Sequence, residues 1–155
     1  PRGMLKLTSP GTNQYREMKF LVRRHGKAQT LNVQTFRETQ KYLTGKYDLE
    51  VLTLPRTYVR GVEIKQSHTT TVEIPKPGIV NVLLPSNGYG SLFKKEKSGK
   101  LTRIYNFHSD KKRESLILQP GNYELIFRPK SMRRSIYTIR KSFHIKSGSS
   151  TTITL

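Results

Sequence analysis

The stretch VEIKQSHTTTVEI at residues 62–74 returns in altered form as FHIKSGSSTTITL at residues 143–155. Each copy alternates apolar and polar residues, passes through a small polar segment and alternates again, which is the pattern of two strands joined by a turn. The copies align without a gap and are identical at four pairs of positions: Ile64/Ile145, Lys65/Lys146, Thr70/Thr151 and Thr71/Thr152. The chain therefore contains a closing strand pair twice.

Further landmarks recur in the same order between the two halves. PRGMLKL (1–7) matches KPGIVNV (76–82) with Gly3 over Gly78, KFLVRRHGK (19–27) matches LFKKEKSGK (92–100) with Phe20 over Phe93, and GKYDLEVLTLPR (45–56) matches GNYELIFRPK (121–130) with Tyr47 over Tyr123. We infer an internal duplication with a period of roughly 75–80 residues, which is longer than the repeats of a solenoid.

The duplication predicts two domains, residues 1–75 and residues 76–155. The boundary falls in IPKPG (74–78), because Pro75 and Pro77 keep this stretch extended and lack the N–H donors of a sheet ladder.

Strand patterns dominate both halves. YDLEVLTL (47–54), SLILQ (115–119), YELIF (123–127) and SIYTI (135–139) are rich in β-branched and aromatic residues at period two. Pro120-Gly121-Asn122 is a predicted hairpin turn. NVQTFRETQKYL (32–43) is the best helical pattern, but we expect an irregular segment with one helical turn at most. The predicted fold class is all-β: two tandem small antiparallel β-sandwiches, transthyretin-like or immunoglobulin-like, related by internal duplication.

The charge balance is strongly basic. The chain holds 29 Lys and Arg residues against 10 Asp and Glu residues, a net charge of +19. Such a surface attracts polyanions in general, whether nucleic acid, anionic polysaccharide or lipid headgroups.

Other bulk features set fewer limits. The chain has no cysteine, so disulfides do not stabilise it. No apolar run approaches the ~20 residues of a membrane-spanning helix. The sequence opens at Pro1, and we expect it to be part of a longer protein whose targeting signal lies upstream.

The hairpin LQPGNYELIFRP (118–129), followed by the closing FHIKSGSSTTITL (143–155), resembles a known class of modules. It is similar to transthyretin-like, carboxypeptidase-regulatory-like and PEGA-type β-sandwiches. More closely, the chain resembles the C-terminal tandem repeats of secreted von Willebrand factor A domain proteins of Bacteroidetes-type bacteria. YDLEVLTLPR (47–56), VEIPKPG (72–78), RESLILQPGNYELIFRPK (113–130) and SIYTIRKSF (135–143) carry this similarity.

This resemblance implies a non-catalytic accessory module with a periplasmic, cell-surface or secreted location. Its partners would be other domains of the same parent protein, including an upstream von Willebrand factor A domain. The Asp-x-Ser-x-Ser adhesion motif of that domain does not occur in the present sequence, so cation-dependent adhesion would belong upstream.

No catalytic, metal-binding or cofactor-binding residues are predicted. His25, His68, His108 and His144 are far apart in sequence and have no cysteine to join them, whereas a metal site needs several converging ligands. His108-Ser109-Asp110 contains the residue types of a hydrolase triad, but consecutive residues cannot usually adopt triad geometry. We therefore expect a non-enzyme.

Basic clusters form the remaining signal for function. The candidate polyanion-binding residues are Arg23, Arg24, Lys27, Lys94, Lys95, Lys97, Lys100, Lys111, Lys112 and Arg113. The repeat alignment places the first two clusters on equivalent hairpins. The alternative is a solubilising surface whose Lys and Arg protect strand edges from pairing.

Two functions stay open at this point. The first is an accessory, adhesion or spacer module of an envelope or extracellular bacterial protein that contacts protein or an anionic glycan. The second is a polyanion-binding protein, for acidic polysaccharide or nucleic acid, that uses basic hairpin tips. Nucleic acid is the less favoured partner, because bases stack on exposed rings and most tyrosines, such as Tyr47, Tyr123 and Tyr137, fall in strand phase.

Overall fold

The computed structural model describes residues 1–130 and 138–155, and all fourteen elements in them are β-strands. The chain divides into two compact units, Pro1–Lys76 and Pro77–Leu155. The division lies one residue later than the position predicted from the two prolines.

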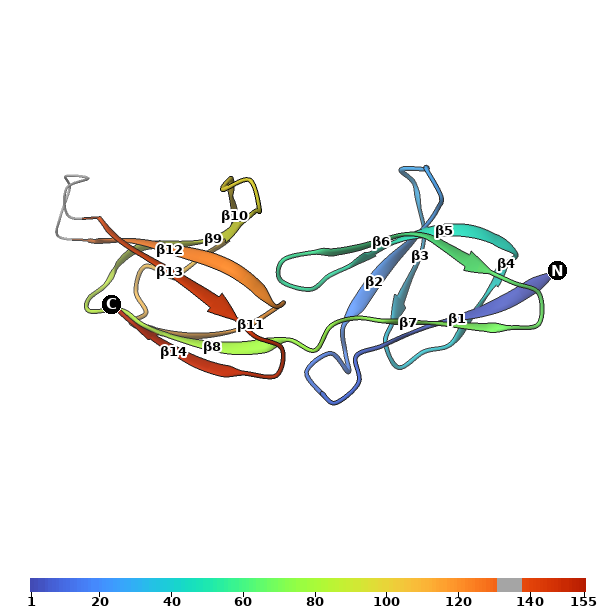
Figure 1. The fold of residues 1–155 in the computed structure, drawn as a ribbon, viewed down its shortest axis with the longest axis horizontal. Coiled ribbons are helices and arrows are strands. Elements are labelled where there is room, and N and C mark those ends of the chain that lie inside the picture. The colour runs from blue at the N-terminus through green and yellow to red at the C-terminus, as the bar shows by residue number, and fades with distance from the viewer. Residues whose placement is uncertain (131–137) are drawn as a thin grey trace. The chain divides into compact units, whose positions relative to one another are not determined.

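Unit 1 contains seven strands in two sheets. The strands are β1 (Arg2–Thr8), β2 (Lys19–Arg24), β3 (Thr30–Thr35), β4 (Gln40–Leu43), β5 (Gly45–Val51), β6 (Thr57–Ile64) and β7 (Thr69–Glu73). One sheet has the order β4-β1-β7 and the other β3-β2-β5-β6. The two sheets face each other as a sandwich (Figure 1).

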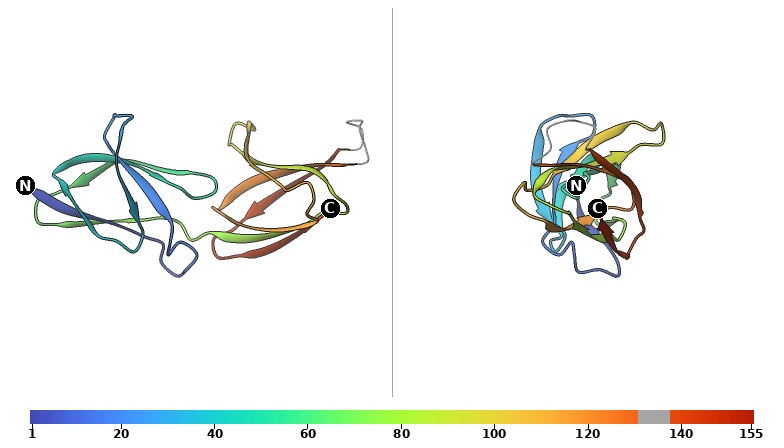
Figure 2. Two further views of the ribbon diagram at one scale, coloured as in Figure 1. Left: turned by 180° about the vertical axis from the view of Figure 1, so that it is seen from behind. Right: turned by 90° about the vertical axis from the view of Figure 1, so that its left-hand side faces the viewer.

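Unit 2 repeats this arrangement strand for strand. Its strands are β8 (Gly78–Leu83), β9 (Gly88–Lys95), β10 (Leu101–Asn106), β11 (Arg113–Leu118), β12 (Gly121–Pro129), β13 (Ile139–Ile145) and β14 (Ser150–Thr154). The sheet orders are β11-β8-β14 and β10-β9-β12-β13, as Figure 2 shows from two further sides. The predicted all-β fold of two sandwiches is confirmed.

Each three-stranded sheet contains one parallel pair, which the antiparallel prediction missed. The β1–β7 pair and the β8–β14 pair are parallel, whereas the other pairings are antiparallel. Leu5 lies opposite Thr70 and Val80 lies opposite Thr151, so the aligned threonines occupy matching positions.

The predicted hairpin turn at Pro120-Gly121-Asn122 is wrong. β11 and β12 belong to different sheets, so this turn carries the chain from one sheet to the other. The β4–β5 turn at Gly45 makes the same crossing in unit 1. Gly45 and Gly121 have φ values of 146° and 154°, which residues with a Cβ rarely adopt.

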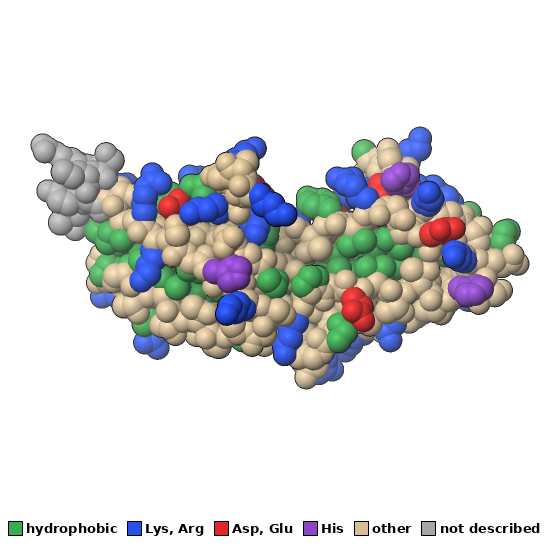
Figure 3. Space-filling model, in the orientation of Figure 1, with side chains coloured by type: hydrophobic (Ala, Val, Ile, Leu, Met, Phe, Trp, Pro, Cys, Tyr) green, Lys and Arg blue, Asp and Glu red, His purple; other side chains and the backbone are tan. Residues whose placement is uncertain are grey.

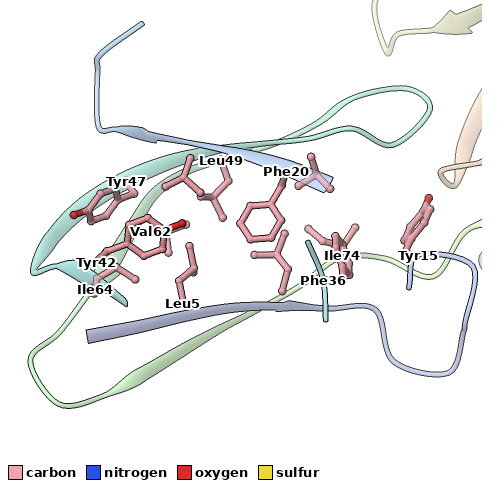
Figure 4. Close-up of a cluster of buried hydrophobic side chains, with 13 residues drawn as sticks. Leu5, Tyr15, Phe20, Phe36, Tyr42, Tyr47, Leu49, Val62, Ile64 and Ile74 are labelled. Atoms are coloured by element: carbon pink, nitrogen blue, oxygen red, sulfur yellow. The ribbon is translucent and has the colours of Figure 1, made fainter. Parts of the chain in front are cut away.

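Alternating residues of the strands fill the core of each unit. Tyr47, Leu49 and Val51 of β5 are at most 2% exposed, and Leu125 and Phe127 of β12 are fully buried. Figure 4 shows the unit 1 cluster, in which Tyr47 and Leu49 point toward residues of the facing sheet such as Leu5. Fully burying one such side chain stabilises the fold by about 1.5–3 kcal/mol, so the period-two pattern is what holds the two sheets together.

A buried tyrosine fixes the same corner in both units. The Tyr47 hydroxyl donates to the carbonyl of Leu43 at 2.6 Å, and the Tyr123 hydroxyl donates to the carbonyl of Gln119. Each bond spans the turn between two sheets, as in the tyrosine corner of other β-sandwiches. The GxY pattern shared by the two halves is explained by this corner.

Gly3 and Gly78 repeat because two chain segments pass too close for a side chain. A Cβ on Gly3 would collide with the Lys65 carbonyl and lie 2.8 Å from Ile64 Cγ2. A Cβ on Gly78 would collide with Ile145 and lie 2.9 Å from the Lys146 carbonyl. The close approach involves the end of β6 in unit 1 and the end of β13 in unit 2.

Other local predictions are corrected. Residues 32–43 form the end of β3, a turn and β4, without a helical turn. The alignment of Phe20 with Phe93 is wrong. Val22 pairs with Leu49 of β5, and Leu92 pairs with the equivalent Leu125 of β12, so Val22 corresponds to Leu92. Phe20, two residues earlier, therefore corresponds to Gly90. Most of SIYTI (135–139), including Tyr137, lies outside the described residues.

Candidate polyanion-binding surface

The first two basic clusters lie on equivalent hairpins. β2 and β3 are joined by a turn at Gly26, and β9 and β10 by a turn at Gly99, with φ values of 75° and 88°. In Figure 1 each hairpin projects beyond the sheets of its own unit. The tips therefore present their side chains to solvent.

In the β2–β3 hairpin the three candidate cations have different surroundings. Arg23 is half-buried, and its Nη1 lies 2.9 Å from Glu50 Oε1. The Arg24 guanidinium lies over the Tyr47 ring, 5.4 Å from its centroid. Lys27 is exposed in the turn, so it is the cation of this hairpin most accessible to a partner.

The β9–β10 hairpin divides its four lysines in the same way. Lys94 Nζ lies 5.1 Å from the centroid of the Tyr123 ring, and Lys95 Nζ donates to the Ser142 hydroxyl at 3.1 Å. Lys97 and Lys100 are exposed in the turn. Arg24 and Lys94 both lie opposite a corner tyrosine, so they cover equivalent corners and are partly occupied by that contact.

The third cluster is not brought to the hairpin tips. Lys111 and Lys112 lie in the β10–β11 loop, and Arg113 begins β11. This loop follows the far end of β10, whose six residues span about 20 Å at strand rise. Lys111, Lys112 and Arg113 therefore form a separate patch of unit 2.

His108 makes its side-chain hydrogen bond to Glu114 of β11 and not to its neighbours Ser109 and Asp110. The ring Nδ1 and backbone N–H of His108 donate to the two Glu114 oxygens at 2.9 and 2.7 Å, and the Tyr105 hydroxyl donates at 2.7 Å. Burial raises the pKa of Glu114, but these hydrogen bonds outweigh it and hold the pKa below its usual value. Burial, together with the bond to Glu114, raises the pKa of Tyr105 to about 12.

Asp48 anchors the β2–β3 hairpin of unit 1 to β6. Its carboxylate accepts hydrogen bonds from His25 Nδ1 at 2.8 Å and from the backbone N–H groups of Gly26 and Gly61, each at 2.9 Å. The bond from His25, followed by the two backbone bonds, holds the pKa of Asp48 well below its usual value. A carboxylate thus sets the position of a basic hairpin.

Few cations are neutralised by carboxylates. Within residues 1–130 and 138–155, the ion pairs to Lys or Arg involve Arg23, Arg37, Arg56 and Arg140. On the face shown in Figure 3, Lys and Arg side chains outnumber the acidic side chains on both units. The excess charge of the sequence is therefore displayed at the surface.

Tyr58 and Arg60 of unit 1 become candidates for the binding surface only once the fold is known. Tyr58 is 57% exposed, and the Arg60 guanidinium lies 5.8 Å from the centroid of its ring. Both lie with Arg23 and Lys27 around one cavity of about 250 Å³. In the sequence, the spacing of Tyr58 and Arg60 two residues apart in a strand indicates that both point to the same face. Their neighbours on that face depend on the pairing of β5 with β6, which the sequence does not show.

Residues 1–130 and 138–155 contain neither a metal-ligand cluster nor a membrane-spanning helix. No group of three His, Asp or Glu side chains there could hold a metal ion. No helix there is long and apolar enough to cross a membrane.

No protein-family model and no curated protein matches the chain. Among solved structures it is similar to the TIE protein of Bacillus anthracis, with a TM-score of 0.41, 11% identity, and coverage of 99% of this chain and 33% of that one. It is also similar to GBS52, the minor pilin of Streptococcus agalactiae, with a TM-score of 0.40, 10% identity, and coverage of 99% and 94%. The pilus adhesin SpaC of Lactobacillus rhamnosus GG, in its open conformation, gives a TM-score of 0.29, 11% identity, and coverage of 84% and 25%. The chain thus spans about a third of the TIE protein, and likeness at this level assigns no function to it.

Proposed function

We propose that this chain is a non-catalytic accessory module of a larger envelope or extracellular protein and that it contacts an anionic glycan through its basic hairpins. The observation that carries the proposal is the set of exposed cations at the two tips. Lys27, Lys97 and Lys100 take part in none of the ion pairs of the described residues, so their charges are free to meet a partner.

A glycan is favoured over single-stranded nucleic acid because no exposed Phe or Tyr ring lies in the β9–β10 turn beside Lys97 and Lys100. Base stacking on aromatic side chains supplies much of single-strand binding. Phe93 is half-buried beneath the Arg103 guanidinium, 5.6 Å from its ring centroid, and Phe107 is 7% exposed. Neither ring of this hairpin region offers a stacking platform.

Retention of the full chain on immobilised heparin in a salt gradient tests the proposal. We expect elution above physiological salt. Exchanging Lys97→Glu with Lys100→Glu should lower the eluting salt concentration more than Lys141→Glu with Lys146→Glu, which makes the same charge change elsewhere in unit 2. Lys94 is not used, because it also covers Tyr123.

Two outcomes would reject this function. Elution of the unaltered chain below physiological salt removes anionic-polymer binding altogether. Equal effects of the two double variants show retention by net charge without a localised tip, since nonspecific binding depends only on the number of charges.

The parent protein is a further part of the proposal. The resemblance to von Willebrand factor A-associated repeats predicts such a domain upstream, to which this chain would be an accessory. The sequence of the complete parent protein tests this prediction, and a parent protein without that domain contradicts it.

A further inference from the structure

The cavity of about 250 Å³ in unit 1 lies between the β2–β3 hairpin and β6. Arg23 and Lys27 of the hairpin, Asp48 of β5, and Tyr58 and Arg60 of β6 line it. The volume falls below the range of about 300–1,000 Å³ that is usual for drug-sized ligands. The cavity therefore suits a small group, such as one sugar residue of a longer chain.

Arg23 provides a donor without an acceptor. Its Nη1 is paired with Glu50, but its Nε is buried and has no hydrogen-bond partner. A buried N–H without a partner is costly, and such groups in folded proteins usually meet an acceptor. The Nε is closed to the cavity as well as to water, so Arg23 contributes its positive charge to the cavity that it lines and not this N–H group.

The charge around the cavity favours an anion. Lys27 and Arg60 are exposed, and neither takes part in the ion pairs of the described residues. Asp48 is the only acidic residue of the lining, and its oxygens already accept from His25, Gly26 and Gly61. Asp48 therefore holds the walls in place. The lining has three cations, Arg23, Lys27 and Arg60, against this one carboxylate, and Arg23 is also paired with Glu50, so the surroundings of the cavity stay positive.

Tyr58 gives the cavity an apolar wall. Tyr58 lies in a strand paired with β5, and its ring stays 57% exposed although the Arg60 guanidinium lies 5.8 Å from the ring centroid. An exposed tyrosine ring beside cations matches the two faces of an acidic sugar, whose C–H groups pack on an aromatic ring while its acid group binds Arg and Lys. A free inorganic anion would use the cations alone.

Unit 2 lacks this combination at the matching positions. The strand registers place Phe93 where unit 1 has Arg23, and Arg140 where it has Tyr58. Arg103 covers the Phe93 ring, and Arg140 Nη1 lies 3.7 Å from Glu124. The combination of cations and an exposed ring is therefore particular to unit 1.

We infer that this cavity binds one acidic sugar residue, with its carboxylate or sulfate on Arg23, Lys27 and Arg60 and its ring on Tyr58. The inference rests on the proposed function, because it names the glycan chemistry that unit 1 selects. The hairpin tips supply general attraction, and the cavity supplies the preference for a sugar.

The test is a titration of the ¹⁵N-labelled full chain with a heparin-derived disaccharide, with maltose and with inorganic sulfate. We expect saturable shifts of the Gly26, Ala28 and Gly61 amides with the disaccharide and no shifts with maltose. Lys27→Gln with Arg60→Gln should weaken disaccharide binding by at least about tenfold, since one lost charged hydrogen bond alone accounts for a change of that size. Lys41→Gln with Lys65→Gln, an equal charge change on the same unit, should weaken it less than about twofold.

Tyr58→Ala separates a sugar from a bare anion. It should weaken disaccharide binding by about threefold to tenfold, as expected for a lost aromatic contact, and leave sulfate binding unchanged. Tyr89→Ala is the matched control, because Tyr89 of unit 2 is 50% exposed beneath Arg128, 5.0 Å away. The amide spectra report whether each variant is folded.

The outcomes distinguish this inference from the proposed function. If the unaltered chain elutes from heparin below physiological salt, the proposed function fails. If it is retained on heparin but the cavity variants bind the disaccharide as tightly as the unaltered chain, the cavity inference alone fails. Equal loss of sulfate and disaccharide binding in Tyr58→Ala also overturns the sugar site.

Discussion

Replacement of Tyr123 by phenylalanine removes one hydroxyl from the corner of unit 2 and leaves the ring in place. That hydroxyl donates to the Gln119 carbonyl, and the Tyr123 side chain is fully buried while Gln119 is 7% exposed. Because water has little access to this corner, the carbonyl loses a donor that solvent cannot easily replace. The ring still fills its space, so no cavity is added.

The expected cost of Tyr123→Phe is about 1–3 kcal/mol, the range for removing one partner of a buried hydrogen bond. Tyr47→Phe makes the same change in unit 1 but should cost only about 0.5–1.5 kcal/mol. Its acceptor belongs to Leu43, which is 49% exposed, so water can take the place of the hydroxyl. The two copies of one corner should therefore differ in sensitivity.

Hydrogen exchange of the full chain, read by mass spectrometry, measures both corners in one experiment. A loss of about 2 kcal/mol corresponds to about 30-fold faster exchange of the most protected amides. In Tyr123→Phe this change should appear in β12 and its neighbours, while peptides from residues 1–76 serve as the internal control. In Tyr47→Phe the smaller change should appear in β5.

A Tyr47→Phe variant at least as destabilised as Tyr123→Phe would refute this reasoning, because burial of the acceptor would then not set the cost. If either variant accelerated exchange equally in both units, the corner hydrogen bond would not act locally, which would also contradict this reasoning.

Three further predictions concern single sites. Asp48→Ala should speed exchange of the Gly26 amide, measured by NMR, because that amide loses its acceptor; unchanged exchange would argue against the anchor. The pKa of Glu114 is lower in the folded than in the unfolded state. Glu114 therefore stabilises the fold above about pH 4.3, and this contribution is lost as the pH falls through the folded pKa. Glu114→Gln should weaken the fall of the unfolding free energy at acid pH, and an unchanged pH dependence would contradict this sign. Gly78→Ala should cost about 3 kcal/mol, because the added Cβ would collide with the Ile145 side chain and the Lys146 carbonyl. Gly99→Ala has open space around it and a φ of 88°, so it should cost about 1 kcal/mol. Denaturant midpoints measure both costs, and equal costs would contradict this difference.

Much of the architecture was predictable because alternating apolar and polar residues indicate a strand with one buried face, and this pattern occurs in both halves of the chain. The alternation around Tyr47 and Tyr123 places every second side chain on one face, and that face is the buried one in both units. The two-sandwich fold follows from this alternation and from the recurrence of the closing strand pair. The error at Pro120-Gly121-Asn122 arose because a tight turn looks the same in sequence whether it joins strands within a sheet or between sheets.

The candidate site was predictable only as a set of charges. The sequence places Lys94 and Lys97 in one cluster, but the register of β9 against β12 puts Lys94 over Tyr123 and the turn leaves Lys97 in solvent. Tyr58 and Arg60 were missed because residues on neighbouring strands meet through pairing, which sequence distance does not reveal.

By itself, the sequence determined the excess of positive charge, the repetition of the units and which side chains enter the core, since these depend on composition and on the two-residue period of a strand. Only the tertiary structure decided which cations are free and which enclose a cavity with an exposed ring. The reason is that strand register and sheet crossing fix contacts between residues far apart in the chain, and the accessibility of a charge depends on those contacts.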